Sequence, residues 1–219
     1  MIQLKTISDS KKVFHLCFPF VIAPIYRRIT DELLVELHLL NHQKNFKPTH
    51  VFALGLIKVF EEFMQGYRPE EHKTKLFDAL CKSNNIDSNE IRKKADVTAK
   101  EFAKWELEDI EVYFNKQESD WNDLQKTGLD YFDKPGTPYS RLSVIGLYTL
   151  LKGLKTNKED KILKETMKAI TESIGFNNSR VERDISAYEN NIEKMRQALE
   201  LMKESIKREQ RKKKERENN

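Results

Sequence analysis

The stretch PIYRRITDELLVELHLL, residues 24–40, decides the fold class. It opens with a proline, which suits the first position of a helix because no backbone N–H is needed there. Apolar residues then recur every three or four positions and therefore share one helix face. That face consists of Ile25, Ile29, Leu33, Leu37 and Leu40, widened by Leu34 and Val35. Because so wide an apolar face needs more than one packing partner, we predict the central helix of an all-α body.

Patterns of the same kind predict helices along the rest of the chain. The expected ranges are about 6–16, 24–41, 49–65, 69 onward, 88–126, 139–151, 156–174 and 179–206. The range 88–126 should contain one break, near 96–98 or around 115–119. Gly55 and Gly146 fall inside expected helices, where glycine costs about 1 kcal/mol relative to alanine. We therefore expect another helix to approach closely at both positions.

Four capping signals support these boundaries. In each signal, a side chain that can accept a hydrogen bond from a backbone N–H of the first helical turn is followed three residues later by an acidic residue. The pairs are Thr6–Asp9, Asp87–Glu90, Thr156–Glu159 and Ser179–Glu182. The chain has only 7 glycines and 6 prolines. Such scarcity of turn-forming residues argues against an all-β fold and against an α/β fold with many glycine loops.

The last expected helix carries a heptad repeat. Its apolar positions are Val181, Ile185, Tyr188, Ile192, Met195, Leu199, Met202 and Ile206, spaced alternately by four and three residues. We call this narrow stripe the seam; it is typical of a coiled coil. The predicted organisation is thus an all-helical body over 1–175, a long coiled-coil-like helix over 176–206 and a basic, disordered tail over 207–219.

The net charge of +4 is located in the last residues of the chain. From Lys203 to the C-terminus there are eight Lys or Arg and four Glu, a difference equal to the whole surplus. The rest of the chain is therefore balanced and makes no case for an anionic ligand. A basic tail has three interpretations: a solubilising end, a contact with anionic lipid or an acidic protein face, or nucleic-acid binding. Nucleic acid is not expected, because the tail lacks interleaved aromatic residues.

Four blocks of the sequence resemble the thylakoid formation protein family, also described as a photosystem II biogenesis factor. The blocks are PIYRRITDELLVELHLL at 24–40, ALGLIKVFEEFMQGYRPEE at 53–71, YSRLSVIGLYTLL at 139–151 and RVERDISAYENNIEKMRQALELM at 180–202, followed by the basic RKKKER. They occur in the family's order and cover most of the chain from about Thr6 onward.

The resemblance implies a non-enzymatic role in thylakoid membrane organisation and in photosystem II biogenesis or repair. It also implies association with an FtsH-type membrane protease complex, whose accumulation the family supports. The expected location is peripheral to the thylakoid membrane on the cytoplasmic side of a cyanobacterial-type cell, or on the stromal side in a plastid. An alternative is a helical accessory protein that binds nucleic acid or anionic lipid through the basic tail.

We find no catalytic, metal-binding or cofactor-binding constellation. His38 and His42 have helical metal-ligand spacing, but no glutamate follows His38, so an HExxH motif is absent. Nor do the carboxylates form ExxH pairs. Cys17 and Cys81 lack metal spacing, and we expect buried, reduced thiols. We therefore predict that the protein is not an enzyme and holds no metal or cofactor.

No run of the sequence reaches the roughly 18–20 apolar residues of a membrane span. The most apolar run, residues 13–25, is interrupted by His15, Pro19 and Pro24, and it lacks the features of a signal peptide. We expect it to belong to the fold.

The predicted partner-binding residues lie at the end of the last helix and in the tail. They are Met195, Leu199, Met202, Ile206, Arg211, Lys212, Lys213 and Lys214. The distal seam offers apolar contacts, and the tail adds attraction to an acidic or membrane-adjacent surface.

Overall fold

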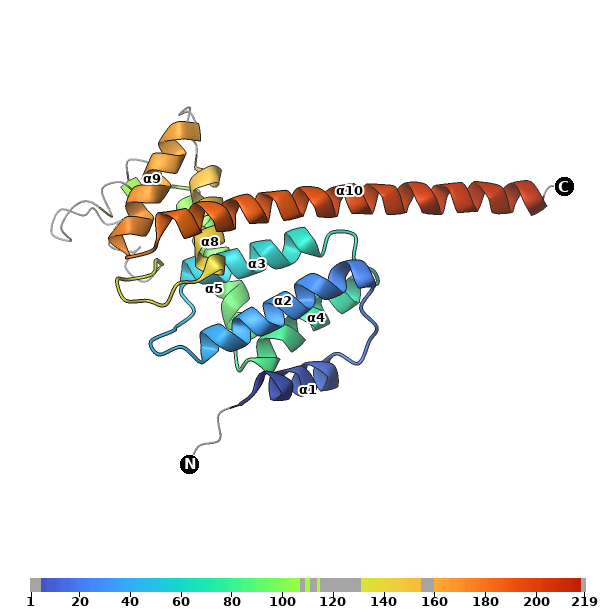
Figure 1. Ribbon diagram of the computed structural model, residues 1–219, viewed down its shortest axis with the longest axis horizontal. Helices are drawn as coiled ribbons and strands as arrows, with labels where there is room; N and C mark the ends of the chain where they lie inside the picture. The colour runs from blue at the N-terminus through green and yellow to red at the C-terminus, as the bar shows by residue number, and fades with distance from the viewer. Residues whose placement is uncertain (1–4, 107–108, 111–113, 115–130, 155–159, 218–219) are drawn as a thin grey trace. The chain divides into compact units, whose positions relative to one another are not determined.

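A computed structural model describes residues 5–106, 109–110, 114, 131–154 and 160–217. Over these residues every regular element is a helix, which confirms the all-α prediction. The helices are α1 (Ile7–Cys17), α2 (Pro24–Asn41), α3 (His50–Phe63), α4 (Glu70–Ser83), α5 (Ser88–Phe102), α8 (Arg141–Gly153), α9 (Asp160–Ser173) and α10 (Asn178–Glu217) (Figure 1). The chain divides into one unit over residues 1–185 and a second over residues 186–219.

Helix α2 has the wide buried face that its sequence predicts. Leu33 and Leu37 are 0% exposed, and Leu34 is 1% exposed. The helix packs against both α1 and α4, so its apolar stripe does require two partners. Its bounds, Pro24–Asn41, also match the expected range.

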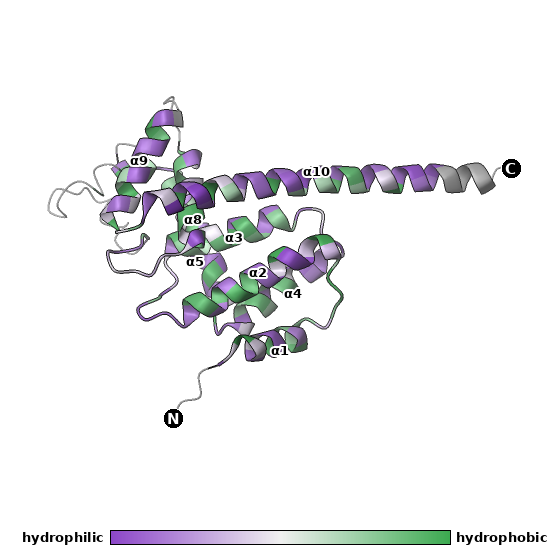
Figure 2. Cartoon of the chain, viewed as in Figure 1, coloured by the Kyte–Doolittle hydropathy of each residue, from purple (hydrophilic) through white to green (hydrophobic). Residues whose placement is uncertain are grey.

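The most extensively packed helix is nevertheless α3, which corrects our prediction that α2 is central. Helix α3 packs against α5 and α8, and these are the two largest helix contacts among the described residues. Six consecutive residues of α3, positions 51–56, are buried. The charged residues of α3 are confined to its second half, so its first half is covered on all sides, whereas α2 keeps a charged face for solvent along its length. Figure 2 shows this difference between the two helices.

Two glycines allow α3 and α8 to meet at backbone distance. A Cβ built on Gly55 would lie 1.8 Å from the Leu142 carbonyl oxygen, and one on Gly146 would lie 2.0 Å from the Val51 carbonyl oxygen. Any side chain at either position would therefore overlap with the backbone of the facing helix. The expected close approach is confirmed, and each glycine faces the other's helix.

The predicted helix starts are partly confirmed. Thr6 and Asp9 form a capping box on α1, and the Asp87 carboxylate accepts from the Asn89 and Glu90 amides at 2.8 and 3.3 Å. The Ser179 cap is wrong, because the Asn177 side chain accepts from the Arg180 amide at 3.0 Å. Serine and asparagine are about equally good caps, so the sequence alone does not choose between them.

The expected break at 96–98 is also wrong, because α5 continues through these residues to Phe102. Thr98 lies inside the helix with its hydroxyl donating to the Lys94 carbonyl at 2.6 Å. The alternative break at 115–119 and the Thr156 cap fall outside the described residues.

Helix α10 extends farther than we predict from the seam. It continues to Glu217, where the sequence analysis expects a disordered tail from Lys207. Lys, Arg, Gln and Glu dominate this stretch and are all good helix formers. A pair at helical spacing, Arg208 with Glu204 at 3.8 Å, adds local support. The helix therefore outlasts the seam, which ends at Ile206.

Candidate partner-binding surface

The beginning of α10 is fixed to the first unit by an aromatic and polar cluster. The Tyr139 hydroxyl donates to the Asp184 carboxylate at 2.6 Å, and the Arg180 guanidinium lies 3.8 Å from the centre of the Tyr139 ring. Burial, followed by the hydrogen bond to Asp184, raises the pKa of Tyr139 well above its ordinary value. The side chain is therefore a neutral donor at physiological pH, and it fixes the register of α10 where the helix starts.

The turn that leads into α10 is equally well held. Gly175 adopts φ +85°, a conformation that glycine reaches without strain. The Asn178 side chain bonds both the Thr171 hydroxyl, at 2.9 Å, and the Glu172 carboxylate. The Phe176 ring packs against the Tyr139 ring with centroids 5.0 Å apart. This corner gives α10 a defined starting direction from α9.

The seam residues of the second unit share one face of α10. At 3.6 residues per turn, Met195, Leu199, Met202 and Ile206 fall within about a sixth of a turn of one another. Met202 is 45% exposed and Ile206 is 47% exposed, whereas Leu199 is half-buried and Met195 is buried. Figure 2 shows apolar residues as isolated bands along an otherwise hydrophilic helix. The part of the predicted surface that is open to a partner is therefore its distal half.

Local ion pairs support the helix between these residues. Arg196 bonds Glu193 at 2.8 Å and approaches Glu200 to 3.9 Å. The hydrogen bond from Arg196 lowers the pKa of Glu193. These groups are exposed and screened by solvent, so each such pair adds little to helix stability. They preserve the helix while leaving the seam available.

The basic residues continue the same helix. Arg211 is exposed, and Lys212, Lys213 and Lys214 are helical in their backbone. The chain therefore carries its run of basic residues in the same helix, beyond the end of the seam at Ile206.

Sequence reasoning missed one residue on this helix, Leu201, which is 68% exposed. It lies more than a quarter of a turn away from the seam. Leu201 does not fit the alternating spacing of the seam. Exposed leucine outside a periodic stripe carries no signal in the sequence.

In the described part of the chain, His38 and His42 make hydrogen bonds and are not grouped with a third metal-ligating side chain. The His38 Nδ1 lies 2.9 Å from the buried Ser10 hydroxyl, and the His42 Nδ1 donates to the His38 carbonyl at 2.7 Å. Burial lowers the pKa of His38 and so keeps its ring neutral. Among the described residues, no three His, Cys, Asp or Glu side chains are grouped as metal ligands.

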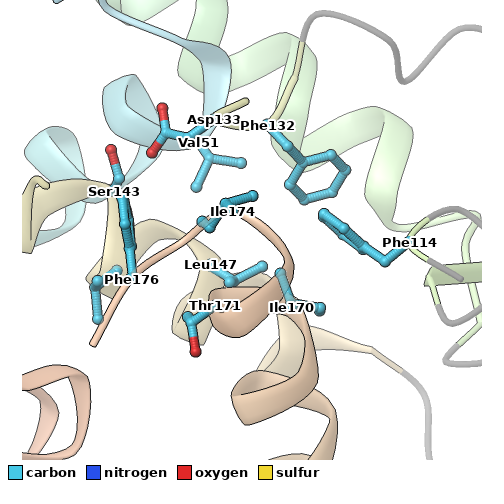
Figure 3. Close-up of a pocket in the computed structure, with 11 residues that line it drawn as sticks. Val51, Phe114, Phe132, Asp133, Ser143, Leu147, Ile170, Thr171, Ile174 and Phe176 are labelled. Carbon is cyan, nitrogen blue, oxygen red and sulfur yellow. The ribbon is translucent and has the colours of Figure 1, made fainter. Parts of the chain in front are cut away.

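Two carboxylates inside the first unit, the buried Asp133 and the half-buried Glu36, are the remaining candidates for chemistry. Glu36 pairs with Arg141 at 2.7 Å and links α2 to α8. Asp133 accepts from the Thr49 hydroxyl at 3.0 Å and lines a cavity of about 10 Å³ (Figure 3). That volume holds roughly one water molecule and no substrate. Burial raises the pKa of both carboxyl groups, against the opposing effects of Arg141 on Glu36 and of Ser143 and Thr49 on Asp133. Both groups cross-link helices inside the first unit.

No helix in the described part of the chain is long and apolar enough to cross a membrane.

The sequence matches the family model described as thylakoid formation protein over residues 6–217. It is 44% identical to Protein Thf1 of Prochlorococcus marinus strain NATL1A, over 92% of this chain and 96% of that protein. It is also 44% identical to Protein Thf1 of Synechococcus sp. strain CC9902, over 98% and 94% of the two chains. The fold is similar to the solved structure of Psb29, with a TM-score of 0.81, 31% identity and coverage of 95% and 98%.

Proposed function

Because the chain belongs to the thylakoid formation protein family, we propose that it is a non-enzymatic accessory protein of thylakoid biogenesis and of photosystem II assembly or repair. The family match extends over nearly the whole chain, from α1 to the end of α10. The buried Asp133 is consistent with a structural role, since the cavity beside it holds about one water. The protein works peripherally at the cytoplasmic face of cyanobacterial thylakoid membranes.

In this proposal the distal part of α10 binds the partner, an FtsH-type membrane protease complex. The observation that carries this step is the exposure of Met202 and Ile206, at 45% and 47%, on the same helix face. Methionine and isoleucine in a stripe on an exposed helix suit a groove or a second helix in a partner. The contacts that fix the start of α10 already restrict its conformational freedom. Less conformational entropy is therefore lost on binding, which favours affinity.

The basic end of the helix contributes mainly to the rate of encounter. Residues 207–217 include seven Lys or Arg and three Glu, and Arg211 is exposed. Surplus positive charge attracts acidic protein surfaces and anionic membranes over about 8–10 Å at physiological ionic strength. Partner capture should therefore weaken as salt is raised, while the apolar seam supplies the specific contact.

The test is an affinity pull-down from detergent-solubilised photosynthetic membranes, with the captured proteins identified by mass spectrometry. The bait variants are a chain truncated after Glu200 and the double variant Met202→Glu, Ile206→Glu. The matched control is Leu201→Glu, which alters an exposed apolar residue of the same helix outside the seam.

We expect the wild-type chain and Leu201→Glu to capture the protease complex, and the truncated and double variants to lose it. Capture by the double variant at the wild-type level would place recognition outside the seam. A triple replacement of Lys212, Lys213 and Lys214 with Gln then separates the basic contribution, which should change capture at low salt only.

A further inference from the structure

We propose that the corner between α1 and α2 is a membrane-contact surface that inserts apolar side chains into the headgroup region of an anionic bilayer. The apolar side chains are those of Leu16, Phe20 and Val21. The proposal deepens the proposed function, because it rests on the peripheral placement of the protein at a membrane and identifies the surface that faces the lipid.

This corner exposes more apolar surface than its surroundings. Leu16 is 81% exposed, Val21 is 94% exposed and Phe20 is 40% exposed. They belong to the last turn of α1 and to the connection that follows it, which Figure 2 colours mainly as hydrophobic. Seven large hydrophobic residues are exposed in the described structure, and four of them belong to the first unit. Three of these four, Leu16, Phe20 and Val21, lie within six positions of one another in the sequence.

The exposed residues stand on a well-packed base. Phe18, between Leu16 and Phe20, is 1% exposed and stacks on Phe14 with centroids 6.2 Å apart. The Phe20 ring stacks on the His72 ring of α4 at 3.9 Å. The corner is thus held in place by α1 and α4 while its apolar tips face outward. A preformed surface binds with less loss of conformational freedom than a loop that must first become ordered.

Basic residues flank the exposed apolar side chains along the sequence, and Lys75 of α4 lies beside one of them. Residues 11–28 contain Lys11, Lys12, Arg27 and Arg28, together with His15, and no acidic residue. From α4, the Lys75 ammonium lies 5.5 Å from the centre of the Phe20 ring. The first turn of α4 carries Glu70 and Glu71, and Glu70 is engaged by Arg68 at 4.0 Å and Lys73 at 3.7 Å. The corner therefore combines apolar tips with a cationic margin.

This combination favours a lipid surface over a protein as the occupant. Lysine is depleted at protein–protein interfaces, whereas Lys and Arg beside Leu and Phe are typical of surfaces that bind anionic bilayers. The apolar tips can enter the boundary between headgroups and acyl chains, and the long basic side chains can extend toward lipid phosphates. The absence of a spanning helix among the described residues is compatible with this interfacial mode.

The experiment measures flotation of the full-length protein with vesicles of phosphatidylcholine, with and without phosphatidylglycerol. We expect binding to the phosphatidylglycerol vesicles that decreases with salt. Leu16→Glu and Val21→Glu should each weaken this binding by about tenfold. Both side chains are largely exposed, so the melting temperature of each variant should match that of the wild type. The matched control is Leu39→Glu, an exposed apolar residue on α2 at 52%, which should bind as the wild type does.

Two outcomes overturn the proposal. One is equal vesicle binding by the wild type and the two corner variants. The other is loss of binding only on truncation after Glu200, which would make the basic end of α10 the lipid surface. In the detergent pull-down, the corner variants should still capture the protease complex. Failure of the membrane-contact proposal therefore appears only in the flotation assay, and failure of the partner-binding proposal appears only in the pull-down.

Discussion

Helix α3 and the distal half of α10 are both stable helices, but their stability comes from different sources. In α3, residues 51–56 are buried, and the backbone meets that of α8 at Gly55. In α10, residues 200–211 are all exposed, and ion pairs such as Arg208–Glu204 lie along the helix. One helix depends on tertiary packing, and the other on local propensity and side-chain pairs.

The contrast teaches where sequence change is tolerated. A helix stabilised by tertiary packing fails when one atom is added at its contact surface. A helix stabilised by local pairs accepts most exposed substitutions, since each pair contributes little. Recognition surfaces belong on the second kind of helix, because their residues can change without unfolding the protein.

The largest effect should come from a charge placed in the packed core. Leu37→Asp buries an unpaired carboxylate at a site that is 0% exposed, and should cost about 5 kcal/mol, which is enough to unfold a typical domain. Leu33→Asp should behave alike. Leu39→Asp, on the exposed side of the same helix, should change the free energy of unfolding by less than about 0.5 kcal/mol. Urea denaturation followed by circular dichroism compares them, and equal stability of Leu37→Asp and Leu39→Asp would contradict the role of α2.

Next in size is the single methyl group of Gly55→Ala. The added Cβ meets a backbone oxygen at 1.8 Å, so α3 and α8 must separate, at a cost of about 3 kcal/mol. Gly146→Ala should do the same. Gly153→Ala is the matched control in α8, since nothing lies within 4 Å of its Cβ and the helix gains up to about 1 kcal/mol. Equal melting temperatures of Gly55→Ala, Gly146→Ala and Gly153→Ala would contradict the close packing of α3 against α8.

A smaller effect is the pH dependence contributed by Asp133. Burial raises the pKa of this carboxyl, so the folded protein binds a proton more tightly than the unfolded chain does. Its contribution to stability is therefore greatest at low pH and declines as pH rises from the unfolded pKa through the folded one. Asp133→Asn should remove that decline and keep an acceptor for Thr49. Denaturation midpoints of the wild type and of Asp133→Asn should be measured across the acidic pH range. The same pH dependence in both proteins would contradict the prediction.

The smallest effect on stability should come from truncation after Glu200. Truncation removes residues 201–219. Of these, residues 201–211 are all exposed, and the ion pair between Arg208 and Glu204 is local to the helix, so the melting temperature should change by less than about 2 °C. Differential scanning calorimetry provides the measurement. A drop comparable with that of Gly55→Ala would mean that the end of α10 supports the core.

Sequence patterns predicted the parts of the fold that depend on local chemistry. The bounds of α2, the Thr6 and Asp87 caps and the close approach at Gly55 all follow from residue type and spacing. The greater centrality of α3 does not follow from periodicity, because the continuous apolar stretch 51–56 carries no helical period although it is buried on all sides. The pairing of Glu36 with Arg141, 105 positions apart, depends on tertiary structure and has no sequence signal.

The candidate surfaces show a similar division. Periodicity found the seam, and the structure adds that Met202 and Ile206 are its exposed members. The most apolar run, residues 13–25, contains both buried and exposed side chains. Within α1, Phe14 is buried and Leu16 is exposed because two residues along a helix face different directions. After the helix ends at Cys17, Phe18 is buried and Val21 is exposed, and sequence periodicity predicts neither. The heptad pattern does not predict the length of α10, because the helix continues to Glu217 through polar helix-forming residues that carry no apolar period.

The burial of Cys81 makes the two thiols chemically unequal. Burial raises the pKa of Cys81 to about 12, so almost none of it is thiolate at neutral pH, and thiolate is the form that reacts with alkylating reagents. Cys17, which we expected to be buried, is only half-buried and lies between Leu16 and Phe18 at the end of α1. Cys17 is thus the accessible thiol for attaching a fluorescent label, and it lies at the corner proposed to face the lipid.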